Sequence, residues 1–542
     1  MEDLLSHLNT VLGTSHALDM PGLRPCLEHA LHTSHDFGQL YGTLRSWWSE
    51  DFTQTLDRMK RLGDEVRVKR GSAIHGSCIQ DCEIPPRRVW DLRSNRVLPY
   101  HVIVQAEAAL QCIEWKLWTV SHSWVDAKEC ERVMTAINGW QWPVPIPRKT
   151  SLDHIRIELL NMGAEYVWLD VLCLRQEGGV DEDRRLEEWQ LDVPTIGHIY
   201  QAYPCYRPCI TYFNGLGLPL DTSLATCESP RHWSKRVWTL QEALDSWLPG
   251  GLTADSLAVD SPMLFDELHS VLSGITTERK EKDLDGVFQA VRNRHCTTEL
   301  DRVAGVAYHL GCETLPLYDR TISIESAWDL LIKHVNRWYR TDFFLQYASE
   351  TPFGLWISWK GLLTSSQPAL PTCTTEVLAK LNLESSAQLS TNEPGQYDHW
   401  GYALGPCSIT RSADMFHLQF TDTNSVTMHV SAEHGIFLPA VAYTLLGLNG
   451  PDGKQYWVVM EVVGEQRVRE HTLVEAIKWG VLYVDSTEAC RLENLDLRGH
   501  EDIRVIYLSS EEALARSKHV NEYMKAFREA RASDGKVKSA AA

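Results

Sequence analysis

Three short clusters in the sequence combine residue types that can carry out chemistry. The first places small hydroxyl groups and a histidine directly after a short apolar run, residues 116–121, which predicts a strand. In α/β folds, ligands bind at the carboxyl ends of such strands. We therefore predict that Ser121, His122 and Trp124 bind a substrate. The alternative is a polar turn whose side chains cap a helix.

The second cluster places a carboxylate inside an apolar run, residues 166–172, which predicts a buried parallel strand. Burial of a charged carboxylate is costly unless the group is paired or hydrogen-bonded. We therefore predict that Asp170 binds the substrate at the same sheet edge as Ser121. The alternative is a structural role, in which Asp170 pairs with Arg175 or caps a neighbouring helix.

The third cluster reads Trp233-x2-Arg236-x-Trp238-x2-Gln241-Glu242. A helix is predicted over residues 235–247 with Ser234 as its cap, and on it Trp238 and Glu242 share a face. A carboxylate beside an indole is partly desolvated, which raises its pKa. Glu242 is thus the candidate catalytic carboxylate, expected to face a cleft shared with the Ser121–Trp124 turn, with Arg236 and Trp238 beside the substrate. The alternative is an ordinary helix on which Glu242 pairs with Arg236.

The sequence predicts no metal site, no nucleotide-binding loop and no esterase motif. The cysteine and histidine groups are His75-x2-Cys78-x3-Cys82 and His198 with Cys205-x3-Cys209. Because no second Cys-x2-Cys pair completes a zinc site, buried or incidental thiols are the preferred interpretation and we expect no metal. The sequence also lacks the glycine-rich loops of nucleotide-binding proteins and the G-x-S-x-G motif of esterases.

Charge and hydropathy argue against two classes of partner. The 542-residue chain has 52 Lys and Arg against 72 Asp and Glu, a net charge of −20. This field repels phosphate backbones, so we expect no nucleic-acid partner. The longest apolar stretch, residues 436–448, is shorter than the roughly 18–20 residues that span a bilayer. Because the first residues also lack a signal-peptide pattern, we expect a cytoplasmic protein with reduced thiols and no membrane span.

Tryptophan is concentrated in one part of the chain. Of the 20 tryptophans, 11 lie between Trp90 and Trp247. A buried indole contributes a large apolar area together with one hydrogen-bond donor. The concentration predicts an aromatic core, and the alternative is an aromatic-walled pocket for a flat ligand.

The same part of the chain alternates strand-like and helix-like segments, which predicts a parallel sheet covered by helices. The expected strands are 116–121, 166–172 and 208–213, and residues 140–147 must be extended because of their alternating prolines. The expected helices are 128–137, 152–162 after the cap Ser151, and 181–203 with a bend at Pro194. Later strands are expected at 417–420, 426–430, 457–463 and 481–484.

These patterns divide the chain into six expected parts. They are a helical N-terminal region over 1–84, an α/β domain over 85–250, a helical region over 251–364, a linker over 365–396, a β-rich C-terminal domain over 397–508, and a charged helix with a disordered tail over 509–542.

The clusters, in this order, resemble the fungal heterokaryon-incompatibility (HET) domain. The matching segments are Pro85-Pro86-Arg87-Arg88-Val89-Trp90-Asp91, Val120-Ser121-His122-Ser123-Trp124, Glu165 to Gln176, His198-Ile199-Tyr200-Gln201-Ala202 and Arg236-Val237-Trp238-Thr239-Leu240-Gln241-Glu242. A later element, Thr298 to Val303, resembles one found downstream of that domain. The family pattern has Tyr and Gly around its first Trp, where this chain has His122 and Val125. This is similar to a divergent, tryptophan-rich branch of the family.

The resemblance implies a role in fungal non-self recognition and regulated cell death. HET domains are regarded as relatives of the TIR domain, which has a flavodoxin-like α/β fold, and some TIR domains cleave NAD with a glutamate that follows a tryptophan. Trp238 and Glu242 have the same Trp-x-x-x-Glu spacing. NAD is therefore the substrate that the resemblance suggests, and another protein is the implied partner, with self-association into a homo-oligomer as a further expectation.

Two other classes of function remain open from the sequence. One is a non-enzymatic interaction and signalling module, whose C-terminal part binds a partner protein. The other is a small-molecule biosynthetic enzyme that reuses the pocket of a HET domain. An assay of NAD cleavage on the pure protein separates the NAD-cleaving HET-domain protein from both of these.

Overall fold

In a computed structural model, the chain forms two compact units. Unit 1 comprises Met1–Lys282 with Gln289–Val335, and unit 2 comprises Asp283–Phe288 with Asn336–Ala542. In unit 1 and around its end, the structure describes residues 1–104, 116–201, 207–253 (without 222 and 243–246) and 284–335 (without 313). Further on, it describes residues 339, 343, 359–364, 396–412, 415–420, 427–430, 437–449, 455–468, 471–484, 487–488, 500–508 and 514–526 (without 523).

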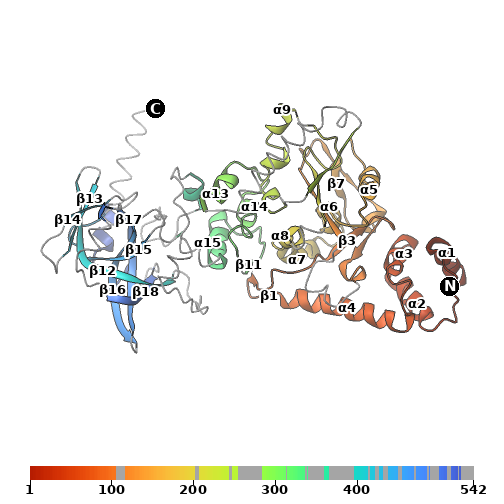
Figure 1. The fold of residues 1–542 in the computed structure, drawn as a ribbon, viewed down its shortest axis with the longest axis horizontal. Helices are drawn as coiled ribbons and strands as arrows, with labels where there is room; N and C mark the ends of the chain where they lie inside the picture. The colour runs from red at the N-terminus through yellow and green to blue at the C-terminus, as the bar shows by residue number, and fades with distance from the viewer. Residues whose placement is uncertain are drawn as a thin grey trace. The chain divides into compact units, whose positions relative to one another are not determined.

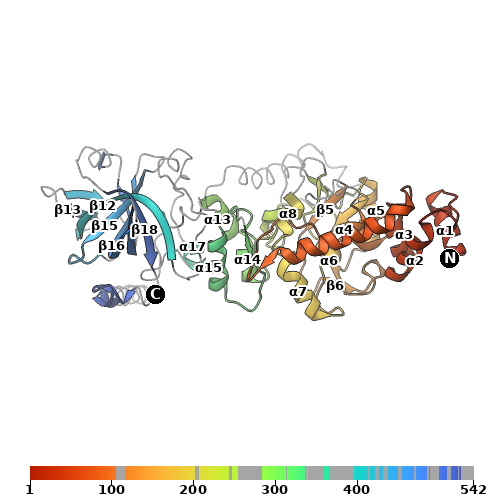
Figure 2. The same ribbon diagram turned by 90° about the horizontal axis from the view of Figure 1, so that it is seen from below.

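The first 72 residues, within the N-terminal region that is expected to be helical, form four helices (Figures 1 and 2). They are α1 (Glu2–Leu12), α2 (Leu23–Thr33), α3 (Phe37–Arg45) and α4 (Phe52–Ser72). Leucines of α1, α2 and α3 form a buried cluster with Trp48 and Phe52. The Arg45 guanidinium joins these helices to the sheet, since its Nη2 lies 2.7 Å from Oδ1 of Asp91. The Trp47 indole donates to the carbonyl oxygen of Val102 at 3.0 Å.

The central sheet of unit 1 is mixed. Its order is β10-β9-β5-β8-β3-β4, with the bounds β3 (Arg88–Asp91), β4 (Arg96–Pro99), β5 (Leu117–His122), β8 (Tyr166–Trp168), β9 (Cys209–Tyr212) and β10 (Trp247–Pro249). β10, β9, β5 and β8 run parallel, whereas β3 is antiparallel to both β8 and β4. The expected α/β class is confirmed, but the sheet is not wholly parallel. The short turn between β3 and β4 can join only antiparallel strands.

β5 lies between β8 and β9, although it precedes both in the chain. The four parallel strands therefore follow the spatial order second, first, third, fourth. The chain leaves β5 toward one side of the sheet and later returns to its other side, so the carboxyl end of β5 lies at a topological switch point. In open α/β sheets, ligands bind in the crevice at such a point.

Helices and turns connect these strands. The helices are α5 (Leu152–Asn161), α6 (Asp170–Cys173), α7 (Glu182–Asp192), α8 (Ile196–Gln201), α9 (Leu224–Cys227) and α10 (Thr239–Glu242). The predicted cap of α5 is confirmed, because Oγ of Ser151 accepts from the His154 N–H at 3.2 Å. The predicted bend at Pro194 is a full break between α7 and α8. Removal of one backbone donor by proline explains the break.

Three of the predicted elements are wrong or too long. Residues 128–137 form a strand, β6 (Cys130–Val133), and a 3-10 turn, η3 (Ala136–Asn138), because β6 pairs with β7 (Val144–Pro147), the extended proline segment. The strand predicted over 166–172 ends at Trp168, and α6 begins two residues later at Asp170. Of the helix predicted over 235–247, residues 239–242 form α10, whereas residue 247 begins β10 and residues 243–246 lie outside the described part. Ser234 lies in a 3-10 turn, η4 (Trp233–Lys235), rather than at a cap.

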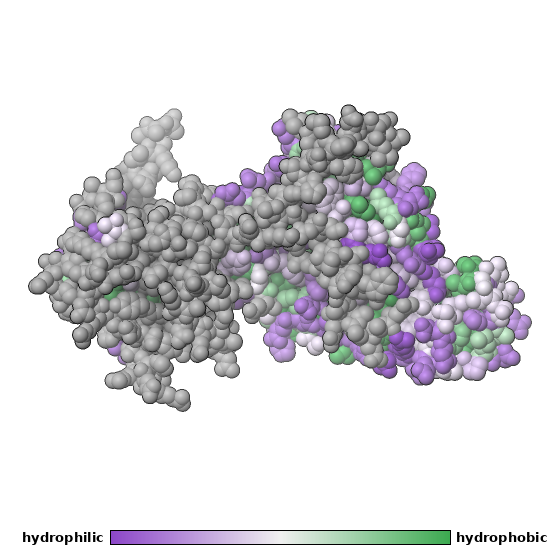
Figure 3. Space-filling view, viewed as in Figure 1, coloured by the Kyte–Doolittle hydropathy of each residue, from purple (hydrophilic) through white to green (hydrophobic). Residues whose placement is uncertain are grey.

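The core of the sheet is aromatic, as one reading of the tryptophan content predicts. Trp90, Trp142 and Trp168 are each at most 1% exposed, and two of them pack with the aliphatic residues of β5, β8 and α5. Trp124 and Trp140 differ, with exposed fractions of 37% and 58%. On the face of unit 1 drawn in Figure 3, hydrophilic residues surround small apolar groups, which is ordinary for a protein surface.

The rest of unit 1 adds a small sheet and further helices. These are β1 (Ile74–His75), β2 (Cys78–Ile79), β11 (Leu315–Pro316), η1 (Tyr100–Val102), α14 (Glu299–Ala304), α15 (Ile324–His334) and α13 (Leu284–Arg292), the last of which is divided between the two units. The 3-stranded sheet has the order β1-β2-β11. Arg236 forms a parallel β-bridge with His295, which connects the segment before α10 to this part of the unit.

Unit 2 contains α17 (Trp359–Thr364) and a 7-stranded sheet of order β14-β13-β12-β15-β16-β17-β18. The strands are β12 (Gln396–Ser412), β13 (Met415–Phe420), β14 (Thr427–Val430), β15 (Tyr443–Asn449), β16 (Gln455–Val468), β17 (His471–Val484) and β18 (His500–Leu508). β12 pairs with both β15 and β18, so this sheet closes on itself. The strands expected at 417–420, 457–463 and 481–484 fall within β13, β16 and β17, and residues 427–430 of the strand expected at 426–430 form β14.

Several expectations fall on residues that the structure does not describe. They are residues 254–283 of the helical region expected over 251–364, residues 365–395 of the linker expected over 365–396, and most of the charged helix and tail expected over 509–542. Within the described ranges, no helix has both the length and the apolar character that crossing a membrane requires.

Candidate functional site

The carboxyl end of β5 brings together the predicted carboxylate and the predicted hydroxyl. Ser121 is fully buried, and its Oγ donates a hydrogen bond to Oε2 of Glu242, on α10. The same Oγ accepts a hydrogen bond of 2.5 Å from the indole Nε1 of Trp233. The three groups form a chain of hydrogen bonds in which the indole orients the hydroxyl and the hydroxyl orients the carboxylate.

Desolvation makes Glu242 an unusually weak acid for a carboxyl group. The residue is partly exposed, but its carboxylate lies in a desolvated position, and this burial raises its pKa to about 7. The hydrogen bond from Ser121 opposes the rise, and the negative charge of Asp170 adds to it. A carboxylate with a pKa near neutrality exchanges protons readily at cellular pH, which is typical of catalytic groups.

The next residue of β5 holds the other predicted carboxylate. Because successive residues of a strand point to opposite faces, His122 reaches a different element from Ser121. Its Nε2 lies 2.8 Å from Oδ1 of Asp170, and its Nδ1 lies 3.1 Å from the carbonyl oxygen of Ser123. Both partners are acceptors, so both ring nitrogens donate, which is the arrangement of a protonated imidazolium.

Electrostatics agree with this protonation state. Burial alone would lower the pKa of His122, but the charge of Asp170 and its hydrogen bond outweigh burial and raise the pKa. Oδ1 of Asp170 also accepts from the N–H of Val171 at 2.7 Å. Asp170 is the first residue of α6, and a negative charge is favourable near the N-terminus of a helix.

The Asp170→Asn variant is expected to lower the pKa of His122 below its usual 6.5. The substitution removes the neighbouring negative charge and leaves the opposing effect of burial, and a carboxylate at this distance is worth about one to three pKa units. NMR titration of the His122 ring measures the change. The matched control is Asp126→Asn in the loop between β5 and β6, where the carboxylate pairs with Arg231 instead. An unchanged His122 titration in Asp170→Asn would contradict the assigned pair.

Two structural alternatives to these roles are wrong. Asp170 does not pair with Arg175, because the Arg175 guanidinium lies 3.4 Å from Glu188 and 2.9 Å from Oε1 of Gln141. Glu242 takes its described hydrogen bond from Ser121, whereas Nη2 of Arg236 donates to Oγ1 of Thr297 at 3.3 Å. Arg236 still acts on the site, since its charge lowers the pKa of Glu242.

Trp238 and Trp124 occupy different surroundings. Trp238 precedes α10, so the helix-face argument that placed it beside Glu242 does not hold, and its indole hydrogen-bonds to the side chain of Asp301. The Trp124 ring lies 5.6 Å from the His122 ring and is 37% exposed. Trp124 thus offers the site an accessible aromatic face beside a cation. The cleft predicted between Glu242 and this turn stays a prediction.

Trp233 is the site residue that the sequence reasoning missed. It stands in the quoted cluster, but only Arg236, Trp238 and Glu242 of that cluster were assigned to the site. The available signal was the indole itself, because a buried tryptophan N–H requires an acceptor and the neighbouring strand end offers a hydroxyl. Among the described residues, no group of three or more His, Cys, Asp or Glu side chains could hold a metal ion.

Comparison with known proteins adds no identification. No family model matches the chain, and neither a curated protein nor a solved structure matches it.

Proposed function

We propose that this chain is a HET-domain signalling protein whose unit 1 cleaves NAD between nicotinamide and ribose. The observation that carries the proposal is the Glu242 carboxylate, which has a pKa of about 7 and is held by Ser121 at the end of β5. The resemblance to the HET family motivates the choice of substrate. The order of the four parallel strands agrees with a TIR-like or flavodoxin-like sheet, whose ligands bind at this switch point.

The proposed reaction uses one ionised carboxylate. The bond between C1′ of the ribose and the nicotinamide nitrogen breaks, and its electron pair remains on the departing neutral nicotinamide. Positive charge develops on the ribose, where the Glu242 carboxylate stabilises it or bonds to it. Water then adds to C1′ and loses a proton, so that NAD and water give nicotinamide, ADP-ribose and one proton.

The other site residues have supporting roles in this proposal. Trp233 and Ser121 hold the carboxylate oxygen in one position. The exposed face of Trp124 stacks on a flat ring of the substrate. The imidazolium of His122, paired with Asp170, keeps the pKa of Glu242 lower than desolvation alone would set it, since His122 is one of the groups that lower it.

In a cell, NAD loss would be the signal for regulated death after non-self recognition. Recognition would come from another protein acting on this chain in the cytoplasm, and self-association of the chain would accompany activation. These steps follow from the family resemblance and rest on the cleavage activity.

The test is an assay of the purified full-length chain with NAD. We expect release of nicotinamide and ADP-ribose in equal amounts, measured by liquid chromatography. The full-length Glu129→Gln chain is the control, because Glu129 is an exposed glutamate outside the site. If the wild-type chain neither binds NAD nor releases nicotinamide at any protein concentration, the proposal fails and the non-enzymatic interaction module is the better reading.

A further inference from the structure

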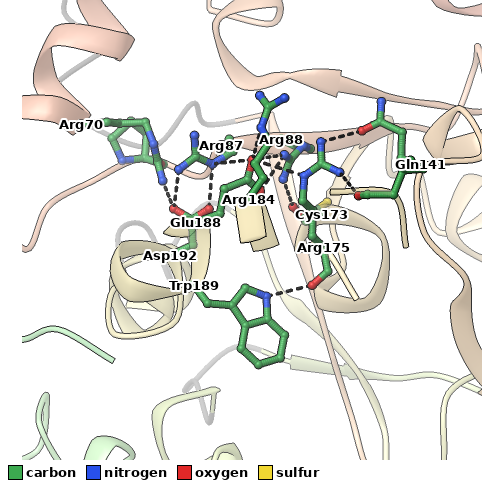
Figure 4. Close-up of polar contacts among 12 residues, drawn as sticks. Arg70, Arg87, Arg88, Gln141, Cys173, Arg175, Arg184, Glu188, Trp189 and Asp192 are labelled. Carbon is green, nitrogen blue, oxygen red and sulfur yellow. Dashed lines mark hydrogen bonds and ion pairs between the residues drawn. The ribbon is translucent and has the colours of Figure 1, made fainter. Parts of the chain in front are cut away.

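A second group of charged side chains lies apart from the Glu242 site, beneath β3 and beside α7. Five guanidinium groups surround the carboxylates of Glu188 and Asp192 (Figure 4), and they belong to Arg70, Arg87, Arg88, Arg175 and Arg184. Both carboxylates are at most 5% exposed. The cluster therefore carries an excess of three positive charges in a chain whose net charge is −20.

Several arginines contact the same carboxylate, so the cluster does not consist of one-to-one ion pairs. Nη2 of Arg88 lies 2.6 Å from Oε1 of Glu188, and the guanidinium groups of Arg175 and Arg184 lie 3.4 Å and 3.3 Å from the same oxygen. Nε of Arg87 lies 2.9 Å from Asp192, and the exposed Glu187 adds an attraction to Arg87.

This arrangement leaves the arginines under mutual repulsion. Burial, followed by repulsion from Arg87 and Arg88, lowers the pKa of Arg70 to about 9. Burial also lowers the pKa values of Arg87 and Arg88 themselves. Buried charges that lack sufficient opposite charge destabilise a fold, so an anion bound here would relieve a cost that the protein itself leaves uncompensated.

A cavity of about 240 Å³ opens onto this cluster. Its lining includes Arg87, Arg88, Arg184, Asn138 and Gln141. The Arg87 and Arg184 side chains are 30% and 58% exposed, so a ligand can reach them from solvent. Ligand pockets for drug-sized molecules are about 300–1,000 Å³, so this cavity suits a smaller molecule.

An unpartnered polar group narrows the choice of ligand. Asn138 is 4% exposed and lines the cavity, and its Nδ2 donates to the carbonyl oxygen of Trp142 at 2.7 Å. Its Oδ1 has no hydrogen-bond partner among the described residues. A buried amide oxygen of this kind accepts from a donor, and a ligand hydroxyl supplies one beside the arginines.

We propose that this cavity binds a small phosphate monoester that carries hydroxyl groups, such as a sugar phosphate. The phosphate oxygens would contact Arg87, Arg88 and Arg184, because guanidinium forks match phosphate geometry. A ligand hydroxyl would donate to Asn138. The indole of Trp142 stiffens the wall of the site, since the guanidinium groups of Arg88 and Arg175 each lie 5.3 Å from its ring. This site is separate from Glu242 and does not depend on NAD cleavage.

Thermal unfolding of the full-length chain tests the proposal at constant ionic strength. The probes are ribose 5-phosphate, inorganic phosphate and unphosphorylated ribose. We expect a saturable rise in the melting temperature of unit 1 with both phosphate compounds, larger for ribose 5-phosphate, and no rise with ribose. Equal shifts with ribose, or no saturable shift with either phosphate compound, would overturn the site.

Variants locate the binding. Arg184→Gln is expected to weaken binding about tenfold or more, because a charge-assisted contact is lost. Because the Arg184 side chain is exposed, we expect the variant to fold normally. The matched control is Arg67→Gln on α4, which removes one charge from a side chain that is 77% exposed and outside the cavity. If Arg67→Gln weakens binding as much as Arg184→Gln does, the effect is general screening and the proposal is wrong.

Discussion

The Glu242→Gln variant is expected to release nicotinamide from NAD at least about a hundredfold more slowly than the wild-type chain. Glutamine keeps the shape of the side chain and still accepts the hydrogen bond from Ser121, but it removes the negative charge that stabilises the cationic ribose in the proposed reaction. Loss of one such preorganised electrostatic contact costs on the order of a hundredfold to a thousandfold in rate. The measurement is kcat/KM by nicotinamide release, and an unchanged rate would remove Glu242 from the mechanism.

The pH dependence of the wild-type chain gives an independent check. In the proposed reaction the ionised carboxylate is the active form, and the pKa of Glu242 is about 7. We therefore expect kcat/KM to rise with pH and to level off above that value. Ser121→Ala removes the hydrogen bond that lowers this pKa, and therefore the rise should move to higher pH. The control is Ser123→Ala, because the buried Ser123 Oγ has no hydrogen-bond partner among the described residues.

The sequence predicts the part of the site that lies at the ends of β5 and β8 well, because strand ends are local features. Ser121 and His122 end an apolar run, and the register of β5 with β9 pairs them with Thr211 and Tyr212 at the carboxyl ends of both strands. Asp170 follows the end of β8 on the other side of β5. Parallel strands bring their carboxyl ends to one edge, so the proximity of Ser121 and Asp170 follows from the pattern alone.

Glu242 was placed near Ser121 by an argument that does not hold. Helical spacing from Trp238 was the reason, but Trp238 precedes α10 and hydrogen-bonds to Asp301. A tertiary contact, the β-bridge between Arg236 and His295, holds the segment extended. Propensity within a short window cannot detect a partner nearly 60 residues away, and tertiary pairing overrides it.

The arginine cluster was beyond prediction for a similar reason. Arg87 and Arg88 stand in the family-like motif, but their carboxylate partners lie about 100 residues later on α7. Glu188 and Asp192 are four residues apart and share one face of that helix. The sequence shows this face, yet only the packing of α7 against β3 reveals that five arginines converge on it.

Glu242→Gln is also expected to make unit 1 more stable at high pH, in contrast to its effect on activity. The pKa of Glu242 is raised by folding from 4.5 to about 7, so the folded state prefers the protonated form. The stability associated with that proton is fully present below pH 4.5 and is lost as the pH rises through about 7. Glutamine never ionises, so the variant avoids the loss, which amounts to about 3 kcal/mol.

The measurement is the melting temperature of unit 1 in both chains between pH 5 and pH 8. Comparing wild type with Glu242→Gln cancels the groups whose titration does not depend on Glu242. His122 is the exception, because the Glu242 charge helps to raise its pKa. The difference should be small at pH 5 and should favour the variant increasingly up to pH 8, whereas Glu129→Gln should follow the wild type. A variant that is less stable than wild type at pH 8 would show that the Glu242 charge is compensated in the fold. A catalytic carboxylate is the kind of group for which a protein tolerates such a cost, because stability and activity then oppose each other at one residue.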